Sequence, residues 1–140
     1  MRKRAAVLGS PIAHSLSPTL HNAAYLILGI EAKYDAVEVG SGQLAGFMEQ
    51  VRNTDANWIG FSLTMPLKEE IFSVADIVDP LAEQIRSANT LIPTLDGWLA
   101  TSTDVSGFIW ALASNNVSKF KTVQIIGAGG TARAAAAAVD

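Results

Sequence analysis

Short apolar runs alternate with stretches of helical periodicity along most of this chain. Residues 5–8 form a continuous apolar run, which is typical of a strand buried on both faces. Two more β-rich runs, 34–39 and 58–61, precede apolar stripes at helical spacing, one over 44–51 and one that begins at Pro66. This order predicts an α/β fold in which an open, mostly parallel sheet lies between two layers of helices.

Capping and turn residues mark the ends of further elements. Ser17-Pro18 and Asp79-Pro80 each place a capping residue before a proline, which is typical of a helix start. The first of these helices would be amphipathic and end at Gly29, with His21 at the surface. Its apolar stripe comprises Leu20, Ala23, Ala24, Ile27 and Leu28. Asp96-Gly97 lies between two β-rich runs and predicts a hairpin.

The composition limits the classes of function. The chain has 140 residues, about one domain, and its 49% apolar and 16% charged residues favour a packed core. Ten Lys and Arg against 13 Asp and Glu give a net charge of −3, which argues against a nucleic-acid or acidic-membrane surface. No apolar run reaches the roughly 18 residues of a membrane-spanning helix, and the basic start leads into only a short one. We therefore expect a cytoplasmic protein without nucleic-acid or membrane partners.

A glycine-rich loop follows the β-rich run 123–126 and fits the pattern G-x-G-x-x-A. Its residues are Gly127, Ala128, Gly129, Gly130, Thr131 and Ala132. The first glycine permits a tight turn, the second lets the backbone approach a pyrophosphate, and the alanine permits close helix–strand packing. The following helix N-terminus presents free N–H groups to phosphates. The pattern favours a dinucleotide site, and the alternative is a tight strand–helix turn without a ligand.

A domain boundary is expected near an amphipathic helix that contains Phe108 and Leu112. Residues 1–104 are long enough for a compact α/β domain. Residues 105–140 would be a linking helix and the first strand, turn and helix of a Rossmann domain. Because a second strand is missing and the ribose-reading residue would lie about 20 positions on, we expect a truncated chain and leave NADP and NAD open.

The candidate site residues are polar groups at strand-to-helix passages rather than metal ligands. The chain has no cysteine and two histidines, so neither a thiolate zinc site nor a histidine metal centre is expected. Ser15 and Ser17 lie two apart before a helix start, where two hydroxyls and a helix N-terminus suit a small carboxylate. The alternative is that Ser17 only caps the helix and Ser15 is solvated.

Lys68 lies in the first turn of a predicted helix, just after Thr64 at the end of a strand. A cation is disfavoured there, so Lys68 needs a carboxylate neighbour or is under pressure to lose its proton, as in a proton-transfer lysine. Asp104 is the natural counterpart, and Asn89 would join the same pocket at the carboxyl ends of strands. The alternatives are a surface lysine paired with one of the two following glutamates and an aspartate that is only an N-cap.

These stretches together resemble the shikimate dehydrogenase family. The matching residues occur in family order at 9–18 with His21-Asn22, at 64–69, at 87–91, at 103–104 with Gly107-Phe108, and at 127–132. The resemblance covers nearly the whole chain. It implies the family's substrate domain followed by the opening of its NADP-binding domain.

The resemblance implies NADP-linked interconversion of 3-dehydroshikimate and shikimate, a step of aromatic amino-acid biosynthesis. The implied substrate ligands are Ser15, Ser17, Thr64, Lys68, Asn89 and Asp104. The two serines would hold the carboxylate, while the threonine, asparagine and aspartate would bind hydroxyls. Lys68, paired with Asp104, would pass the proton as hydride moves between the ring carbon and the nicotinamide. Residues 127–132 would hold the cofactor, and the protein would be a monomer or homodimer.

Two positions depart from the family pattern. Ser62 and Ser102 stand where the family often has asparagine, and serine has a shorter reach and one donor fewer. The alternatives are therefore a quinate/shikimate dehydrogenase that uses NAD and a non-catalytic module that senses a small acid. Retention of both Lys68 and Asp104 argues against the sensor. Because the family's remaining contacts lie beyond Asp140, we expect weak shikimate binding and little turnover from this chain alone.

Overall fold

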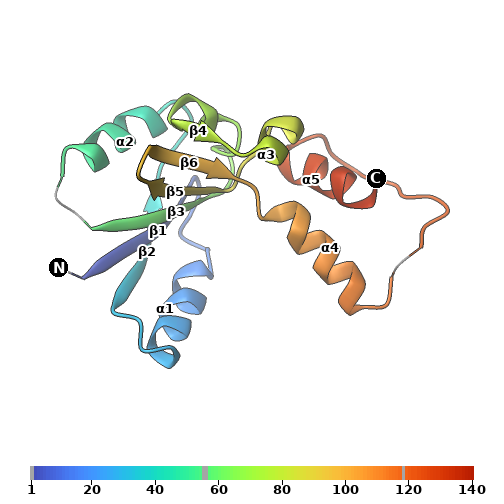
Figure 1. Cartoon of the computed structure of the whole chain (residues 1–140), viewed down its shortest axis with the longest axis horizontal. Coiled ribbons are helices and arrows are strands. Elements are labelled where there is room, and N and C mark those ends of the chain that lie inside the picture. Colours follow the sequence, from blue (N-terminus) through green and yellow to red (C-terminus); the bar gives the residue numbers. More distant parts are fainter. Residues whose placement is uncertain (1, 55–56, 118) are drawn as a thin grey trace.

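The computed structural model describes residues 2–54, 57–117 and 119–140. Its six-stranded sheet has the order β2-β1-β3-β5-β6-β4 (Figure 1). The strands are β1 Lys3–Gly9, β2 Ala32–Glu38, β3 Trp58–Leu63, β4 Ile77–Val78, β5 Thr90–Thr94 and β6 Gly97–Thr101. β1 pairs in parallel with β2 and β3, and β4 does so with β6, whereas β5 is antiparallel to both of its neighbours. The predicted α/β fold is confirmed, with β5 as the strand that makes the sheet mixed.

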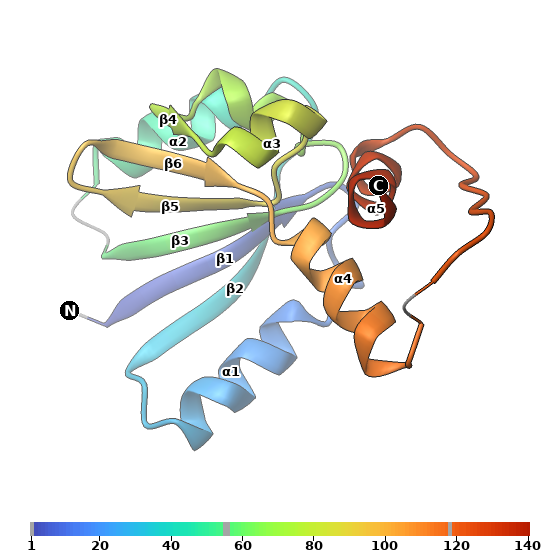
Figure 2. The ribbon, with the colours of Figure 1, turned by 45° about the vertical axis from the view of Figure 1, so that its right-hand side comes forward.

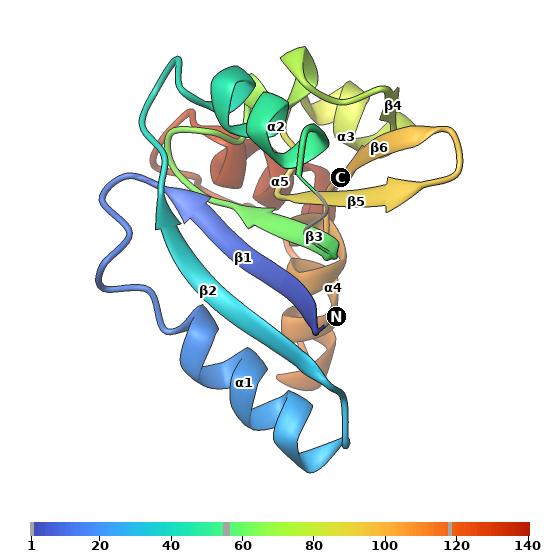
Figure 3. The same cartoon turned by 90° about the vertical axis from the view of Figure 1, so that its left-hand side faces the viewer.

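The helices form two layers on the sheet and a separate group beside it. They are α1 Ser17–Ile27, α2 Leu44–Arg52, the 3₁₀ helix η1 Glu70–Ser73, α3 Pro80–Ile85, α4 Asp104–Ser114 and α5 Gly130–Val139. Figure 3 shows α2 and α3 on one face of the sheet and α1 on the other. α4 and α5 lie side by side beyond the carboxyl ends of β1 and β3 (Figure 2). In the part of the chain that the structure describes, no helix has the length and apolar character that crossing a membrane requires.

The larger core lies between the sheet and the layer of α2, η1 and α3. Leu44, Met48 and Val51 form the buried face of α2, as the helical stripe predicts. They pack with Phe61 of β3 and Ile71 of η1, both of which are almost fully buried. Burial of each such side chain contributes about 1.5–3 kcal/mol, so this layer fixes the strands whose ends carry the candidate site.

α1 lies on the sheet with its polar side inward, contrary to the sequence prediction. The predicted stripe is exposed, with Ile27 at 83%, while His21 stacks on the ring of Tyr34 at 4.0 Å. β2 is an edge strand, so its outer backbone groups need partners from outside the sheet. Asn22 supplies them: its Nδ2 donates to the Tyr34 carbonyl (2.8 Å) and its Oδ1 accepts from the Tyr34 N–H (3.0 Å).

The predicted cap is confirmed at one helix and wrong at the other. Asp79 Oδ1 accepts hydrogen bonds from two N–H groups in the first turn of α3. Ser17 is instead the first residue of α1, and Leu16 precedes it without any side-chain cap. The Ser17 N–H donates to Ser15 Oγ (3.3 Å), so a side chain outside the helix takes over this role.

Two other local predictions are wrong, and the predicted hairpin is confirmed. Residues 65–69 form turns before the 3₁₀ helix, so Lys68 is not in an α-helix. β5 and β6 form the predicted hairpin, with Leu95 and Asp96 in its turn and Gly97 as the first residue of β6. Residues 123–126 form no strand, because a strand requires a hydrogen-bonded neighbour and no described strand pairs with them. Of the predicted Rossmann start, the structure contains the glycine turn and the helix.

Candidate active site

Lys68 and Asp104 meet at the carboxyl edge of the sheet. Lys68 belongs to the turn after β3, and Asp104 is the first residue of α4, which follows β6. Lys68 Nζ lies 2.6 Å from Asp104 Oδ2, and the two side chains are only 19% and 21% exposed. A pair this short and this well covered is a charge-assisted hydrogen bond rather than a loose surface contact.

Asn89 holds the carboxylate of Asp104 in place. Its Nδ2 donates to Asp104 Oδ1 (2.8 Å), so each carboxylate oxygen has its own donor. Asn89 Oδ1 accepts from the Thr103 N–H (3.0 Å), which ties the amide to the start of α4. The carboxylate also lies at the N-terminal, electropositive end of that helix, a favourable place for a negative charge.

Lys68 has a second partner in the glycine loop. Its Nζ donates to Thr131 Oγ1 (3.1 Å) as well as to Asp104. The two glutamates that follow Lys68 bond elsewhere: Glu69 pairs with Arg133, and Glu70 accepts from Ser41 and Gly42. An ammonium group has three donors, so one remains for a ligand beyond these described partners.

Thr64 lies between the ends of β1 and β3. Its N–H donates to the Leu8 carbonyl (2.9 Å), and its carbonyl accepts from the Leu67 N–H (2.8 Å). A Cβ at Gly9 would overlap the Thr64 methyl group, so glycine allows the loop after β1 to approach Thr64 closely. The backbone of Thr64 is therefore held by contacts on both sides.

Ser15 and Ser17 lie on the loop between β1 and α1. In the described part of the chain, neither serine forms a hydrogen bond with Lys68, Asp104 or Asn89. Glu38 anchors this loop by accepting from Ser10 Oγ (2.7 Å) and from the Ile12 N–H (3.1 Å). The structure thus brings Lys68, Asp104 and Asn89 into one hydrogen-bonded group, with Thr64 and Lys68 lining the same cavity. The two serines lie on the loop that Glu38 anchors.

Tyr34 connects the serine loop with β3. The ring nitrogen His21 Nδ1 lies 2.9 Å from the Ser17 carbonyl, and the His21 ring stacks on Tyr34. The Tyr34 hydroxyl donates to Ser62 Oγ at 2.7 Å. Burial raises the pKa of the Tyr34 phenol, and the hydrogen bond to Ser62 opposes that shift. The phenol therefore stays protonated and leaves the Ser62 proton free to donate elsewhere.

Tyr34, Glu38 and Arg133 are structural residues of the site that sequence reasoning missed. All three lie within regular elements or at their ends, and none belongs to a motif with recognised spacing. A weak signal exists only for Arg133, a cation four residues after the second glycine of the loop. The contacts of the other two depend on sheet order, which one sequence does not reveal.

A cavity of about 830 Å³ lies beside the Lys68 pair. Its lining includes Thr64, Lys68, Phe108 and the glycine-loop residues 127 and 129–132. Gly127 has φ +126°, a conformation that side chains disfavour, and no atom lies within 4 Å of a Cβ built on Gly129. α5 begins without a side-chain cap, so its first N–H groups are available to an anion. This open glycine surface at a helix start fits the phosphates of a dinucleotide.

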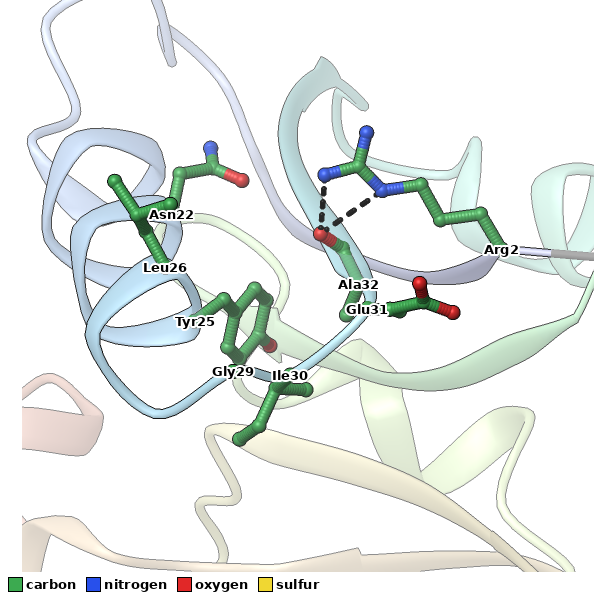
Figure 4. Close-up of a pocket in the computed structure, with 8 residues that line it drawn as sticks. All are labelled: Arg2, Asn22, Tyr25, Leu26, Gly29, Ile30, Glu31 and Ala32. Atoms are coloured by element: carbon green, nitrogen blue, oxygen red, sulfur yellow. Dashed lines mark hydrogen bonds between the residues drawn. The ribbon is translucent and has the colours of Figure 1, made fainter.

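A second cavity lies away from these groups. It has a volume of about 750 Å³ and lies between the end of α1 and the start of β2 (Figure 4). Arg2 donates to the Ala32 carbonyl there through two nitrogens, at 3.2 and 2.9 Å. None of the candidate site residues lines it. In the described ranges, no three His, Asp or Glu side chains group as metal ligands.

The fold and the site define an α/β domain with a polar cleft at the carboxyl edge of its sheet and a glycine loop beside it. Residues 7–91 match the family described as shikimate dehydrogenase substrate binding domain. This match extends over more than half of the chain, which therefore belongs to this family.

Known relatives agree with this assignment. The NADP(+) shikimate dehydrogenase of Prochlorococcus marinus MIT 9312 is 35% identical over 129 residues, which cover 91% of this chain and 44% of the relative. The shikimate 5-dehydrogenase of Thermus thermophilus, solved with NADP(H) and shikimate, is 38% identical with a TM-score of 0.88 and covers 97% of this chain. The Listeria monocytogenes enzyme, solved with shikimate and NAD, is 33% identical with a TM-score of 0.85 and covers 95% of this chain. The chain spans about half the length of these relatives.

Proposed function

We propose that this chain is the substrate-binding part of an NADP-dependent shikimate dehydrogenase. The reaction is the reversible reduction of 3-dehydroshikimate to shikimate, in the pathway to aromatic amino acids. Residues 1–104 would bind the substrate, and 105–140 would link to the NADP-binding domain and begin it. The observation that carries the proposal is the 2.6 Å contact between Lys68 and Asp104 beside the glycine loop.

The polar groups suit a small hydroxylated acid. Ser15 precedes α1 and Ser17 opens it, so both hydroxyls lie at the electropositive end of this helix, which attracts an anion. We assign the substrate carboxylate to these two serines. Thr64 offers a hydroxyl and Asp104 a carboxylate to ring hydroxyls, and Asn89 would exchange its amide bond to Thr103 for one to the ligand. Several short polar groups define such a ligand better than an apolar pocket does.

Lys68 would exchange the proton of the reacting hydroxyl. When the carbonyl is reduced, the ammonium group donates a proton to the oxygen that becomes the hydroxyl, and in the reverse direction the amine takes it back. Asp104 holds Nζ in place through a short hydrogen bond. A bound nicotinamide cofactor would supply or accept the hydride at the neighbouring carbon.

The glycine loop would hold the diphosphate of the cofactor. The open surface at Gly129 and the free N–H groups at the start of α5 support this role. We favour NADP because the curated relatives are named for it, while NAD stays the alternative, since the Listeria monocytogenes structure contains NAD. Because substrate and cofactor would be dissolved small molecules, we propose a cytoplasmic location.

Substrate binding is tested by titrating shikimate into the 140-residue chain in a calorimeter. We expect weak binding that Ser15→Ala and Ser17→Ala reduce further, because each removes a donor to the carboxylate. Ser73→Ala is the matched control, since among the described residues the Ser73 hydroxyl bonds to the Glu70 carbonyl within η1 and to no candidate site residue. If the two loop variants bind as well as the control does, the carboxylate is not held there.

Turnover is tested in a fusion in which this chain replaces the matching half of the Thermus thermophilus enzyme. With shikimate and NADP⁺ the fusion should produce NADPH, which absorbs at a wavelength where NADP⁺ does not. Lys68→Ala should lower kcat by about 100- to 10,000-fold, the usual contribution of a positioned acid–base group, and leave KM for shikimate nearly unchanged. Near-normal kcat in this variant would refute the role of Lys68. Shikimate binding without any turnover in a folded fusion would favour the sensor alternative.

A further inference from the structure

Arg133 joins the glycine loop and α5 to the α/β part of the chain at residues 1–104, called the first unit below. Its Nε donates to the Ile85 carbonyl (2.7 Å), and its Nη2 donates to the Arg86 carbonyl (2.7 Å) and to Glu69 Oε1 (2.7 Å). Its Nη1 donates to the Ala128 carbonyl within the loop (3.1 Å). One guanidinium group therefore bonds to the loop, to the end of α3 and to the residue after Lys68.

The end of α3 is a favourable place for this cation. Ile85 is the last residue of the helix, and Arg86 follows in the left-handed conformation with φ 51°. The last carbonyls of a helix lack intrahelical partners and form its electronegative end, which a planar guanidinium fork suits. Glu69 is 63% exposed, so its ion pair contributes less than these carbonyl contacts do.

Gly130 packs against the backbone segment that supports Lys68. A Cβ at Gly130 would overlap Ser87 Oγ and lie 3.1 Å from Ser87 Cβ and 3.5 Å from Lys68 Cβ. Ser87 is 1% exposed, and among the described residues its buried hydroxyl has no hydrogen-bond partner. The next residue, Ala88, donates its N–H to the Lys68 carbonyl (3.0 Å). Glycine at 130 is therefore required by contact with the first unit and not only by the shape of the loop.

We infer that Arg133 and Gly130 are positioning residues, which fix the glycine loop at a set distance from Lys68 Nζ. Gly130 packs against Ser87, and Thr131 accepts a hydrogen bond from Lys68. Arg133 bonds to the end of α3. This inference rests on the proposed function, because the distance matters only if a dinucleotide on the loop and the lysine act on one substrate. The hydride and the proton belong to neighbouring atoms, so both groups must be in place together.

The contact itself is tested in the 140-residue chain by hydrogen exchange. Arg133→Ala should accelerate exchange of the α5 amides, and Arg133→Lys should have a smaller effect because it keeps the charge but loses the fork. Arg52→Ala is the matched control: Arg52 also bonds to a carbonyl and to a carboxylate, at 3.0 and 3.1 Å, but far along the sequence from the loop. Unchanged exchange in α5 of Arg133→Ala would overturn the inference at its first step.

The consequence for catalysis is tested in the active fusion. Arg133→Ala should lower kcat by about 10- to 100-fold, the cost expected for a displacement of about 1 Å, and leave KM for shikimate unchanged. Gly130→Ala should do the same, and adding Ser87→Gly should restore kcat because it removes the overlap. Equal kcat in wild type and Arg133→Ala, or a rise in KM for shikimate alone, would overturn the inference. A wild-type fusion without turnover would instead count against the proposed function, while the exchange experiment still tests the contact.

Discussion

The proposed chemistry depends on the contact between Lys68 and Asp104. The strength of this contact is measured by removing the two charges singly and together. Lys68→Met keeps the apolar stem and removes the ammonium group. Asp104→Asn keeps an oxygen that can accept from Asn89 and removes the charge. The two variants and their combination form a thermodynamic cycle, in which the difference from additivity is the coupling energy of the pair.

The structure sets the expected coupling energy. A hydrogen bond to a charged group contributes about 1.5–3 kcal/mol, and the 2.6 Å distance between Nζ and Oδ2 is at the short end for such a bond. Both side chains keep about a fifth of their exposure, 19% and 21%, so solvent screens part of the attraction. We therefore expect a coupling energy of about 2 kcal/mol.

Urea unfolding of the four proteins, followed by circular dichroism, gives this value without any assumption about activity. The pair Arg52–Asp76 is the internal control, because its atoms lie 3.1 Å apart but its side chains are 46% and 44% exposed. A matched cycle there should give less than about 1 kcal/mol. Equal coupling energies for the two pairs would refute the argument that Lys68 and Asp104 form a protected site.

Three further predictions concern stability. Asp79→Ala removes the cap of α3 and should lower the free energy of unfolding by about 1–2 kcal/mol in a urea titration. Gly97 has φ +122°, and a Cβ there would overlap the Asp76 carboxylate, so Gly97→Ala should lower the midpoint of thermal unfolding in calorimetry. The pKa of Tyr34 is raised above 10.0 in the folded state. Its contribution to the free energy of unfolding is therefore complete below about pH 10 and is lost as the pH rises through the folded pKa. Tyr34→Phe, which also loses the bond to Ser62, should flatten the alkaline decline of stability seen in unfolding titrations above pH 10.

Much of the fold could be predicted because local rules and tertiary packing agree. The buried face of α2 follows helical periodicity, and the cap at Asp79 follows from the side-chain chemistry of the helix start. The same reasoning gives the wrong buried face for α1. Its inward face carries Asn22, which bonds to the backbone of the edge strand β2, and no pattern in the sequence marks β2 as an edge strand.

The strand predicted at 123–126 is absent for a related reason. Its β-branched residues favour a strand, but strand geometry is stabilised only by pairing, and no described strand lies beside it. The adjacent α5 needs no such partner, since its hydrogen bonds are internal. Local propensity therefore predicts the helix of this unit and not its strand.

In the candidate site, too, some residues could be predicted from the sequence and others could not. Lys68 and Asp104 could be paired from sequence because a cation and an anion that both follow strand ends have a reason to meet, although β5 lies between their strands. The residues that hold the site act instead on backbone groups: Glu38 on an N–H of the serine loop, and Arg133 on carbonyls at the end of α3. Such contacts leave no complementary residue pair in the sequence. It follows that substitutions at Glu38 and Arg133 should displace the serine loop and the glycine loop, respectively, while the Lys68–Asp104 bond stays intact.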